Sequence, residues 1–317
     1  MRTAKKMKDA ATKRSAALKT VSLKSVDAAD GDARLAVSKT YKIFIGGKFP
    51  RTESGRYYEA RSPKGALLAN ICLSSRKDFK AAVVAAREAF EKWSQATAYN
   101  RGQILYRMAE MLEGRREQFI AEVIAHGANR KNASAEVSGA IDRLVYYAGW
   151  ADKYPQIFSA VNPVSTAHFN FSVPEPTGVV GIIAPEESPL LGLVSVVAPV
   201  IVGGNTCVVL ASHSKPLPAV TLTEVVGTSD LPGGVLNLLT GTRKELVSQF
   251  ASHMDVNAIV YSGKARSEIV EVQEQAALNI KRVTIETRSD WFSAAAQSPY
   301  AILRTQEIKT TWHPVGW

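Results

Sequence analysis

Two cysteines are the strongest nucleophiles in this sequence, and both lie in apolar surroundings. Cys72 is part of ANICL and Cys207 is part of TCVVL, short apolar runs typical of buried strands. A thiol attacks only as its thiolate, and burial disfavours that charged form. We therefore predict buried structural thiols. Two cysteines without metal-ligand spacing form neither a disulfide framework nor a metal site, a usage that favours the reducing cytoplasm as the location.

The segment PTGVVGIIAPEESP, residues 176–189, is the most informative part of the chain, because an apolar run leads directly to the adjacent carboxylates Glu186 and Glu187. Four other segments accompany it. They are the hairpin-like run from Tyr41, the helical AAVVAAREAFEKW, the loop LPGGVLNLLTG of residues 231–241 and KRVTIE of residues 281–286. In their order and separations, these five motifs resemble the aldehyde dehydrogenase family from about Tyr41 to Glu286.

The resemblance implies a fold and a damaged oxyanion site. The expected fold is α/β, with an aldehyde dehydrogenase-like Rossmann-type parallel sheet, flanking helices and an oligomerisation strand segment. Glu186 and Glu187 stand where the family has Trp and Asn, and that Asn helps to hold the oxyanion of a thiohemiacetal. A carboxylate at Glu187 would oppose the negative charge that develops in the transition state.

The cofactor motifs also depart from the family. Ala211 and Ser214 stand where the family has the Lys and Glu that hold the adenosine ribose. The turn at Gly263 and Lys264 keeps the shape of a phosphate-binding helix start, but Glu268 replaces a second glycine. We expect no cofactor, with retained NAD binding as the alternative. By resemblance, the residues that would line the NAD site are Ile183, Pro185, Gly241, Gly263 and Lys264.

The base and the nucleophile complete the comparison. Glu286 aligns with the family's general base, which activates water, and Thr287-Arg288-Ser289 replace the Leu-Gly-Gly that follows it. We predict a vestigial base in an ion pair, with Arg288 as the candidate partner. The family's nucleophilic cysteine lies beyond this Glu in a separate catalytic domain, whereas residues 287–317 contain no Cys. We therefore expect both the nucleophile and that domain to be missing.

Hydrophobic periodicity predicts the elements that position these residues. A stripe through Phe79, Val83 and Ala86 predicts an amphipathic helix that begins at a Ser cap, and residues 99–126 and 134–151 have helical patterns. From Thr177 onward, strand-like runs alternate with helix-length segments, which predicts βαβ units and a parallel sheet. These runs are Val179–Ile183, Cys207–Leu210, Val235–Leu239, Ala258–Tyr261 and Val283–Ile285.

Length and composition suit a globular protein: 317 residues, 46% hydrophobic and 21% charged, allow roughly two domains. The longest apolar stretch, from Pro189, is too short to span a bilayer and contains Pro199, so we predict a buried helix. The predicted organisation is a basic disordered leader over 1–40, an NAD-binding-like domain over 41–290, and a linker with a C-terminal oligomerisation strand over 291–317.

Much of the net charge of +10 lies in the first 25 residues, where eight basic residues accompany Asp9. This leader is either a solvated flexible arm or an address or contact segment, such as a transit peptide or a polyanion-binding arm. Aromatic residues do not interleave with its lysines, which argues against nucleic-acid binding.

Two further segments point to assembly. EIKTTWHPVGW, residues 307–317, resembles the family's tail strand and, in particular, the tail of the truncated, cysteine-less second module of the aldehyde dehydrogenase-16 subfamily. HFNFSVPEP has the alternation of an exposed strand. We therefore expect contact strands within residues 155–175 and 307–317, because unpaired strand edges accept further strands.

The leading hypothesis is a catalytically silent aldehyde dehydrogenase-like subunit that assembles with a complete aldehyde dehydrogenase, or with itself, and stabilises or regulates it. One alternative is an NAD(P)-dependent aldehyde dehydrogenase that oxidises aldehydes to carboxylic acids with a site completed by a partner's thiol. A second is polyanion binding through residues 1–25. A third is a product made redundant by a frameshift. No membrane partner is expected.

Overall fold

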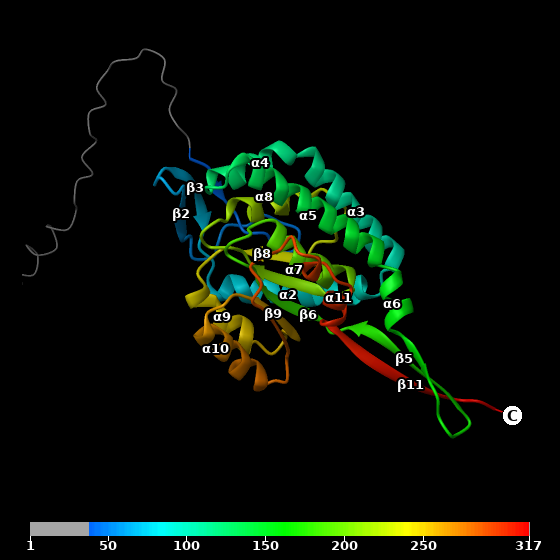
Figure 1. Ribbon diagram of the computed structural model, residues 1–317. Coiled ribbons are helices and arrows are strands. Elements are labelled where there is room, and N and C mark those ends of the chain that lie inside the picture. Colours follow the sequence, from blue (N-terminus) through cyan, green and yellow to red (C-terminus); the bar gives the residue numbers. More distant parts are fainter. Residues whose placement is uncertain (1–37, 317) are drawn as a thin grey trace, which may run out of the picture. The chain divides into compact units, whose positions relative to one another are not determined.

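A computed structural model describes residues 38–316 of the chain, and a five-stranded parallel sheet forms its centre (Figure 1). The strand order is β10-β9-β6-β7-β8, and all neighbours are parallel. The five strands are β6 (Val179–Ile183), β7 (Thr206–Leu210), β8 (Leu236–Leu239), β9 (Ala258–Ser262) and β10 (Arg282–Glu286). The α/β fold and all five predicted strands are confirmed. The predicted leader falls almost wholly outside the described residues.

Helices cover both faces of this sheet. α7 (Leu191–Val202) and α8 (Leu217–Gly227) lie on one face, and α2 (Arg76–Ser94), α9 (Arg243–Ser252) and α10 (Arg266–Ala277) lie on the other. Side chains alternate along each strand, so Val180 and Ile182 join one core while Val179 and Ile183 join the other. Burial on both faces explains why the strands are continuously apolar.

The buried helix predicted from Pro189 onward is confirmed as α7, in which every residue is buried. Pro199 lies inside it. Within residues 38–316, we find no helix with the length and apolar character needed to cross a bilayer.

The helices of residues 98–150 form a further layer outside α7 and α8, whereas α2 lies on the opposite face of the sheet. The cap predicted for α2 is confirmed, because Ser75 and Asp78 bond reciprocally in a capping box. The pattern over residues 99–126 forms two helices, α3 (Ala98–Gly114) and α4 (Arg116–Ala125), because the backbone leaves the helical region at Arg115 (φ −112°, ψ 15°). The third predicted helix is α5 (Arg130–Trp150), which packs against α3 and α7.

The N-terminal hairpin differs from the prediction. The Gly46-Gly47 turn is present, with positive φ at both glycines, but only Ile45 and Lys48 pair across it. The hairpin with extended strands is formed later, by β2 (Tyr57–Arg61) and β3 (Leu67–Cys72), and β1 (Thr40–Tyr41) pairs with β3. Phe44, in the middle of the predicted strand, forms a bridge to Leu238 of β8. The predicted strand therefore pairs with the central sheet and not with a second strand of its own hairpin.

A separate antiparallel sheet, ordered β11-β5-β4, contains both predicted contact strands. β4 (Ala160–Asn162) follows α6 (Lys153–Phe158), β5 spans His168–Pro176, and β11 spans Gln306–Pro314. β5 and β11 run side by side and project away from the helical layers (Figure 1). The chain reaches β11 through η1 (Ala294–Ala296) and α11 (Tyr300–Leu303). Trp291 and Ile302 of this connection are buried in the core around α7.

Asn205 joins this antiparallel sheet to the central one. Its side chain is fully buried at the start of β7, where Nδ2 donates to the Thr305 carbonyl (2.8 Å) and Oδ1 accepts from the Gly178 amide (2.9 Å). One side chain thus satisfies backbone groups before β6 and before β11. Buried backbone groups without partners are costly, so this amide fixes where β11 begins.

We predict that Asn205→Ala lowers the free energy of unfolding by about 1–3 kcal/mol, because it leaves the buried Gly178 N–H without a partner and removes one of the donors to the Thr305 carbonyl. Denaturant titration measures the change. Asn100→Ala, at an exposed position of α3, is the control and should stay within about 0.5 kcal/mol of the wild type. Equal stability of the two variants would contradict the role assigned to Asn205.

Candidate functional site

The candidate site lies at the carboxyl ends of β6 and β9, where the sheet changes direction. From β6 the chain proceeds to β7 and β8 on one side, whereas β9 returns to the other side of β6. The helices that follow these two strands, α7 and α10, lie on opposite faces. Such a switch point leaves a crevice beyond the strand ends, which is where open α/β sheets bind ligands.

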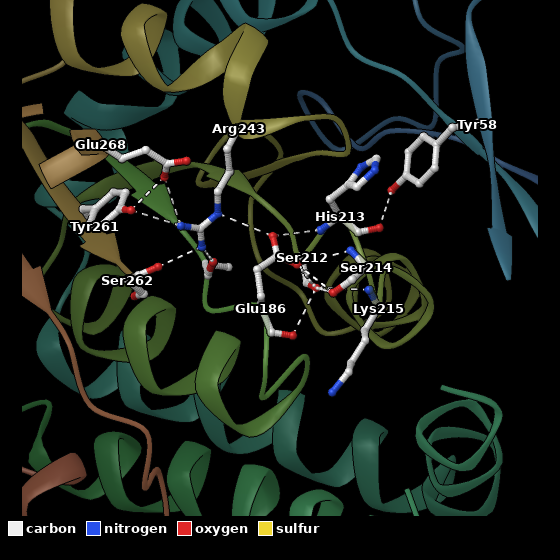
Figure 2. Close-up of polar contacts among 11 residues, drawn as sticks. Tyr58, Glu186, Ser212, His213, Ser214, Lys215, Arg243, Tyr261, Ser262 and Glu268 are labelled. Atoms are coloured by element: carbon white, nitrogen blue, oxygen red, sulfur yellow. Dashed lines mark hydrogen bonds and ion pairs between the residues drawn. The ribbon is translucent and has the colours of Figure 1, made fainter. Parts of the chain in front are cut away.

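The guanidinium of Arg243 lies between the ends of these two strands, and Figure 2 shows its polar contacts. It is the first residue of α9 and is only 16% exposed. Its Nη2 donates to the carbonyls of Ala184, just after β6, and of Ser262, at the end of β9 (2.7 and 2.8 Å). Its Nη1 lies 3.3 Å from the Tyr261 hydroxyl and 3.4 Å from Glu268 Oε2. One cation therefore bridges the two strands that flank the switch point.

Glu186 provides the counter-charge from the loop after β6. Its Oε1 lies 3.4 Å from Arg243 Nε and accepts from the His213 amide (3.2 Å). Its Oε2 accepts from the Ser212 hydroxyl (2.7 Å) and from both the amide (3.2 Å) and the hydroxyl (2.8 Å) of Ser214. The donors in the loop after β7 are therefore engaged by a carboxylate of the same chain (Figure 2).

We call Glu186, Arg243, Tyr261 and Glu268 the crevice cluster. Burial raises the pKa of the Glu186 carboxyl, but the hydrogen bonds from residues 212–214 outweigh it, and the net shift is downward. Burial and the hydrogen bond to Glu268 (2.7 Å) raise the pKa of Tyr261 to about 12. At neutral pH the cluster therefore holds an ionised Glu186 carboxylate and a neutral Tyr261 hydroxyl.

The cofactor-lining residues predicted by resemblance differ in their exposure. Ile183, Pro185 and Gly241 are buried, while Lys264 is exposed. The Gly263 amide donates to the Glu286 carbonyl (3.0 Å). A Cβ built on Gly263 would lie 2.6 Å from the Tyr261 hydroxyl oxygen and 2.7 Å from Arg243 Nη1. The space at this turn is already taken by the crevice cluster.

The two predicted catalytic carboxylates lie in different places. Glu286 is 9% exposed and forms ion pairs with Arg288 (Nη2 to Oε2, 2.7 Å) and Arg304, so the expected pairing with Arg288 is present. Glu187 is exposed and lines a hollow of about 470 Å³, to which Glu136 also contributes and Glu286 does not. Neither the transition-state role of Glu187 nor the vestigial role of Glu286 is tested by this geometry.

The sequence matches the family model described as "Aldehyde dehydrogenase family" over residues 49–290. The chain belongs to the aldehyde dehydrogenase family. It is 34% identical over 257 residues to retinal dehydrogenase 2 of Gallus gallus, covering 78% of this chain and 48% of that protein. It is 31% identical over 247 residues to an aldehyde dehydrogenase of Aspergillus niger, covering 77% and 49%.

Solved structures agree with this assignment. The NAD+ complex of an aldehyde dehydrogenase from Bacillus cereus superposes with a TM-score of 0.74 at 29% identity, covering 78% of this chain and 50% of that one. The chain thus spans about half the length of these relatives.

Both cysteines of this aldehyde dehydrogenase family member are buried, as predicted. Cys207 lies on β7 and is fully buried, and that burial raises the pKa of its thiol. Cys72 ends β3 and is 3% exposed. Neither lines the crevice. Among the described residues, no three His, Cys, Asp or Glu side chains gather as a metal site would require.

Sequence reasoning missed Arg243, the central residue of the site. A signal for it existed, because Arg243 and Lys244 open α9, and cations are disfavoured at the positive end of a helix dipole unless anions pair with them. Arg143 was missed too. It is 3% exposed on α5 and donates to the Trp291 carbonyl (2.8 Å) and the Ser195 hydroxyl (2.5 Å), which holds the segment after Glu286 against the helices.

We predict that Glu186→Gln lowers the free energy of unfolding by about 1–3 kcal/mol at neutral pH, because charge-assisted hydrogen bonds are lost. A lowered folded-state pKa stabilises fully above the unfolded value of 4.5, and this contribution is lost as the pH falls from there through the folded-state pKa. The difference from the wild type should therefore shrink as the pH falls below about 4.5. Glu187→Gln, at an exposed carboxyl, is the control. Denaturant titrations at several pH values measure both, and a pH-independent difference would contradict the assignment.

We also predict that neither native thiol reacts with a chromogenic thiol reagent on the timescale that modifies both in the denatured chain, because thiolates in apolar interiors are disfavoured. Lys264→Cys places an accessible thiol beside the crevice and should react at once. Rapid modification of Cys72 or Cys207 in the folded wild type would contradict their assignment as buried structural thiols.

Proposed function

We propose that this chain is a catalytically silent aldehyde dehydrogenase subunit that acts by assembly with another chain of the same fold and thereby stabilises or regulates it. The observation that carries the proposal is the crevice cluster. At the strand ends where the fold would receive a dinucleotide, Arg243 donates to the carbonyls of Ala184 and Ser262. Glu186 accepts from the hydroxyls of Ser212 and Ser214, so these groups already have partners within the chain.

The cluster argues against a bound dinucleotide on two counts. A pyrophosphate needs backbone N–H donors and tolerates no fixed anion beside it, yet the Glu186 carboxylate already accepts from the amides of His213 and Ser214. Admitting a ligand also requires Arg243 to leave the carbonyls of Ala184 and Ser262. Each such hydrogen bond from a charged donor contributes about 1.5–3 kcal/mol. We therefore propose that the subunit works without NAD.

The carboxylates argue in the same direction. Arg288 and Arg304 engage both oxygens of Glu286, so this carboxylate is committed to holding its strand end against the segment that leads to β11. An activating base needs an oxygen directed at water. Glu187 would place a negative charge where an oxyanion must be stabilised. In this proposal Glu286 serves structure, and neither carboxylate takes part in catalysis.

A working dehydrogenase completed by a partner's thiol is the second candidate. It is favoured by the family match over residues 49–290 and by the Bacillus cereus relative, whose structure is an NAD+ complex. Polyanion binding through residues 1–25 lies outside the described residues.

We predict that titration of the full chain with NAD up to about 1 mM, the upper end of ordinary KM values, gives no saturable heat. Mixing the chain with NAD and a panel of aldehydes should give no reduced cofactor by absorbance. A complete aldehyde dehydrogenase, measured in parallel, is the positive control. Turnover by the purified chain alone would refute the silent-subunit proposal, and turnover only after adding a second protein would favour the trans-completed enzyme.

A further inference from the structure

The antiparallel sheet has a long unpaired edge at β11. In the order β11-β5-β4, β11 has a strand neighbour on one side only within the described residues. All but the first two of its nine residues are exposed, including Ile308 (50%) and Trp312 (57%). A long edge with exposed apolar side chains is a template for another strand.

Alternate residues of β11 hydrogen-bond to β5, and this alternation shows which backbone groups face the open edge. Two bonds flank the strand in the register of the β11–β5 pairing: the Val315 amide donates to the Ala167 carbonyl, and the Thr177 amide donates to the Thr305 carbonyl. Because bonded pairs alternate in an antiparallel ladder, the odd-numbered residues of β11 face β5. The even-numbered ones direct their N–H and C=O groups to the open edge.

The prolines of the sheet agree with this parity. Pro174 and Pro176, which have no N–H, lie opposite Ile308 and Gln306, and both pairs are of the non-bonded kind. The open edge therefore offers complete donor and acceptor sets at Ile308, Thr310 and Trp312. At Pro314 the donors stop, since proline offers only its carbonyl.

We propose that a second copy of this chain pairs with this edge, antiparallel and two-fold symmetric about Thr310, to give one six-stranded sheet ordered β4-β5-β11-β11-β5-β4. This inference rests on the proposed assembly function and names its partner. Of the symmetric registers, only the one centred on Thr310 pairs the whole strand, from Gln306 to Pro314, with itself. This register also brings even-numbered residues of the two copies opposite each other, and these are the residues whose backbone N–H and C=O groups face the open edge.

The side chains of β11 complement each other in this register. Glu307 lies opposite His313 of the second copy and Ile308 lies opposite Trp312, each pair occurring twice by symmetry. An imidazole can donate a hydrogen bond to a facing carboxylate, and aromatic–β-branched pairs stabilise neighbouring strands. Moving the two-fold centre to Lys309 would place two ammonium groups opposite each other, which is unfavourable, and a centre at Lys309 or Thr311 would pair odd-numbered residues, whose backbone groups face β5. The sequence of the strand therefore selects one register of pairing with itself.

The register predicts a site-specific cross-link. At the two-fold centre, the Thr310 Cα atoms of the two copies form a bonded pair about 5.5 Å apart, within the roughly 4.4–6.8 Å range of a disulfide. The full-length Thr310→Cys variant should therefore give a covalent dimer on mild oxidation. Ile308→Cys is the matched control, because it shares the exposed edge but its copies lie roughly 14 Å apart along the strands. Equal cross-linking of both variants would overturn the register.

A charge exchange tests the same geometry without oxidation. By sedimentation equilibrium, the wild-type chain should be a dimer of the 34.3 kDa chain. His313→Glu should weaken dimerisation about tenfold, because each Glu307 carboxylate then faces a second carboxylate. Combining it with Glu307→Lys should restore the affinity, since opposite charges then face each other. A double variant no tighter than His313→Glu would contradict the pairing.

The outcomes separate this inference from the proposed function. A monomeric wild-type chain that binds a complete aldehyde dehydrogenase would overturn self-pairing and leave the silent-subunit proposal standing. A dimer that shows the predicted cross-link and nevertheless oxidises aldehydes with NAD would support self-pairing and overturn the silent-subunit proposal. A monomer that binds no such enzyme would overturn both.

Discussion

The bridge that Arg243 forms between the carbonyls after β6 and at the end of β9 is the interaction on which the interpretation of this protein depends. A parallel sheet whose connections diverge leaves its strand-end carbonyls without partners, and ligands ordinarily occupy that space. Here a buried guanidinium satisfies these carbonyls, and Glu186 balances its charge. Because unpaired buried charges are expensive, neither residue can leave the crevice alone. The polar groups of the site therefore satisfy one another, and in the function we propose this network takes the place of a ligand.

The rest of the molecule extends outward from that network in two directions. Glu286, at the end of β10, is tied by Arg288 and Arg304 to the segment that leads into β11. Asn205 ties the beginning of β11 to the loop before β6. The projecting antiparallel sheet is thus anchored to the central sheet through buried polar contacts, which are directional and fix its position more narrowly than apolar packing does. In the function we propose, a rigid anchor allows an exposed strand to serve as a contact surface.

The relation to the family is one of retained framework and altered site. The fold over residues 49–290 is that of the aldehyde dehydrogenase family, and the parallel sheet, the covering helices and the strand–turn–helix joint at Gly263 are all present. Three of the positions at which the sequence departs from the family's motifs meet through hydrogen bonds and ion pairs: Glu186 accepts from Ser214, and both Glu186 and Glu268 lie beside Arg243. In the function we propose, these departures form one altered surface.

The sequence by itself determined the five parallel strands, the buried helix α7, the buried cysteines and the strands β5 and β11, because each depends on local apolar periodicity or on a contiguous motif. It also gave the pairing of Glu286 with Arg288, whose residues lie only two positions apart. Only the tertiary structure decided that Arg243, which follows β8, lies across the ends of β6 and β9, and that Glu186 faces the loop after β7. It likewise decided that Phe44 pairs with β8 and leaves the predicted hairpin incomplete. Contacts between residues distant along the chain depend on the order of strands in the sheet, and no local pattern of residue types encodes that order.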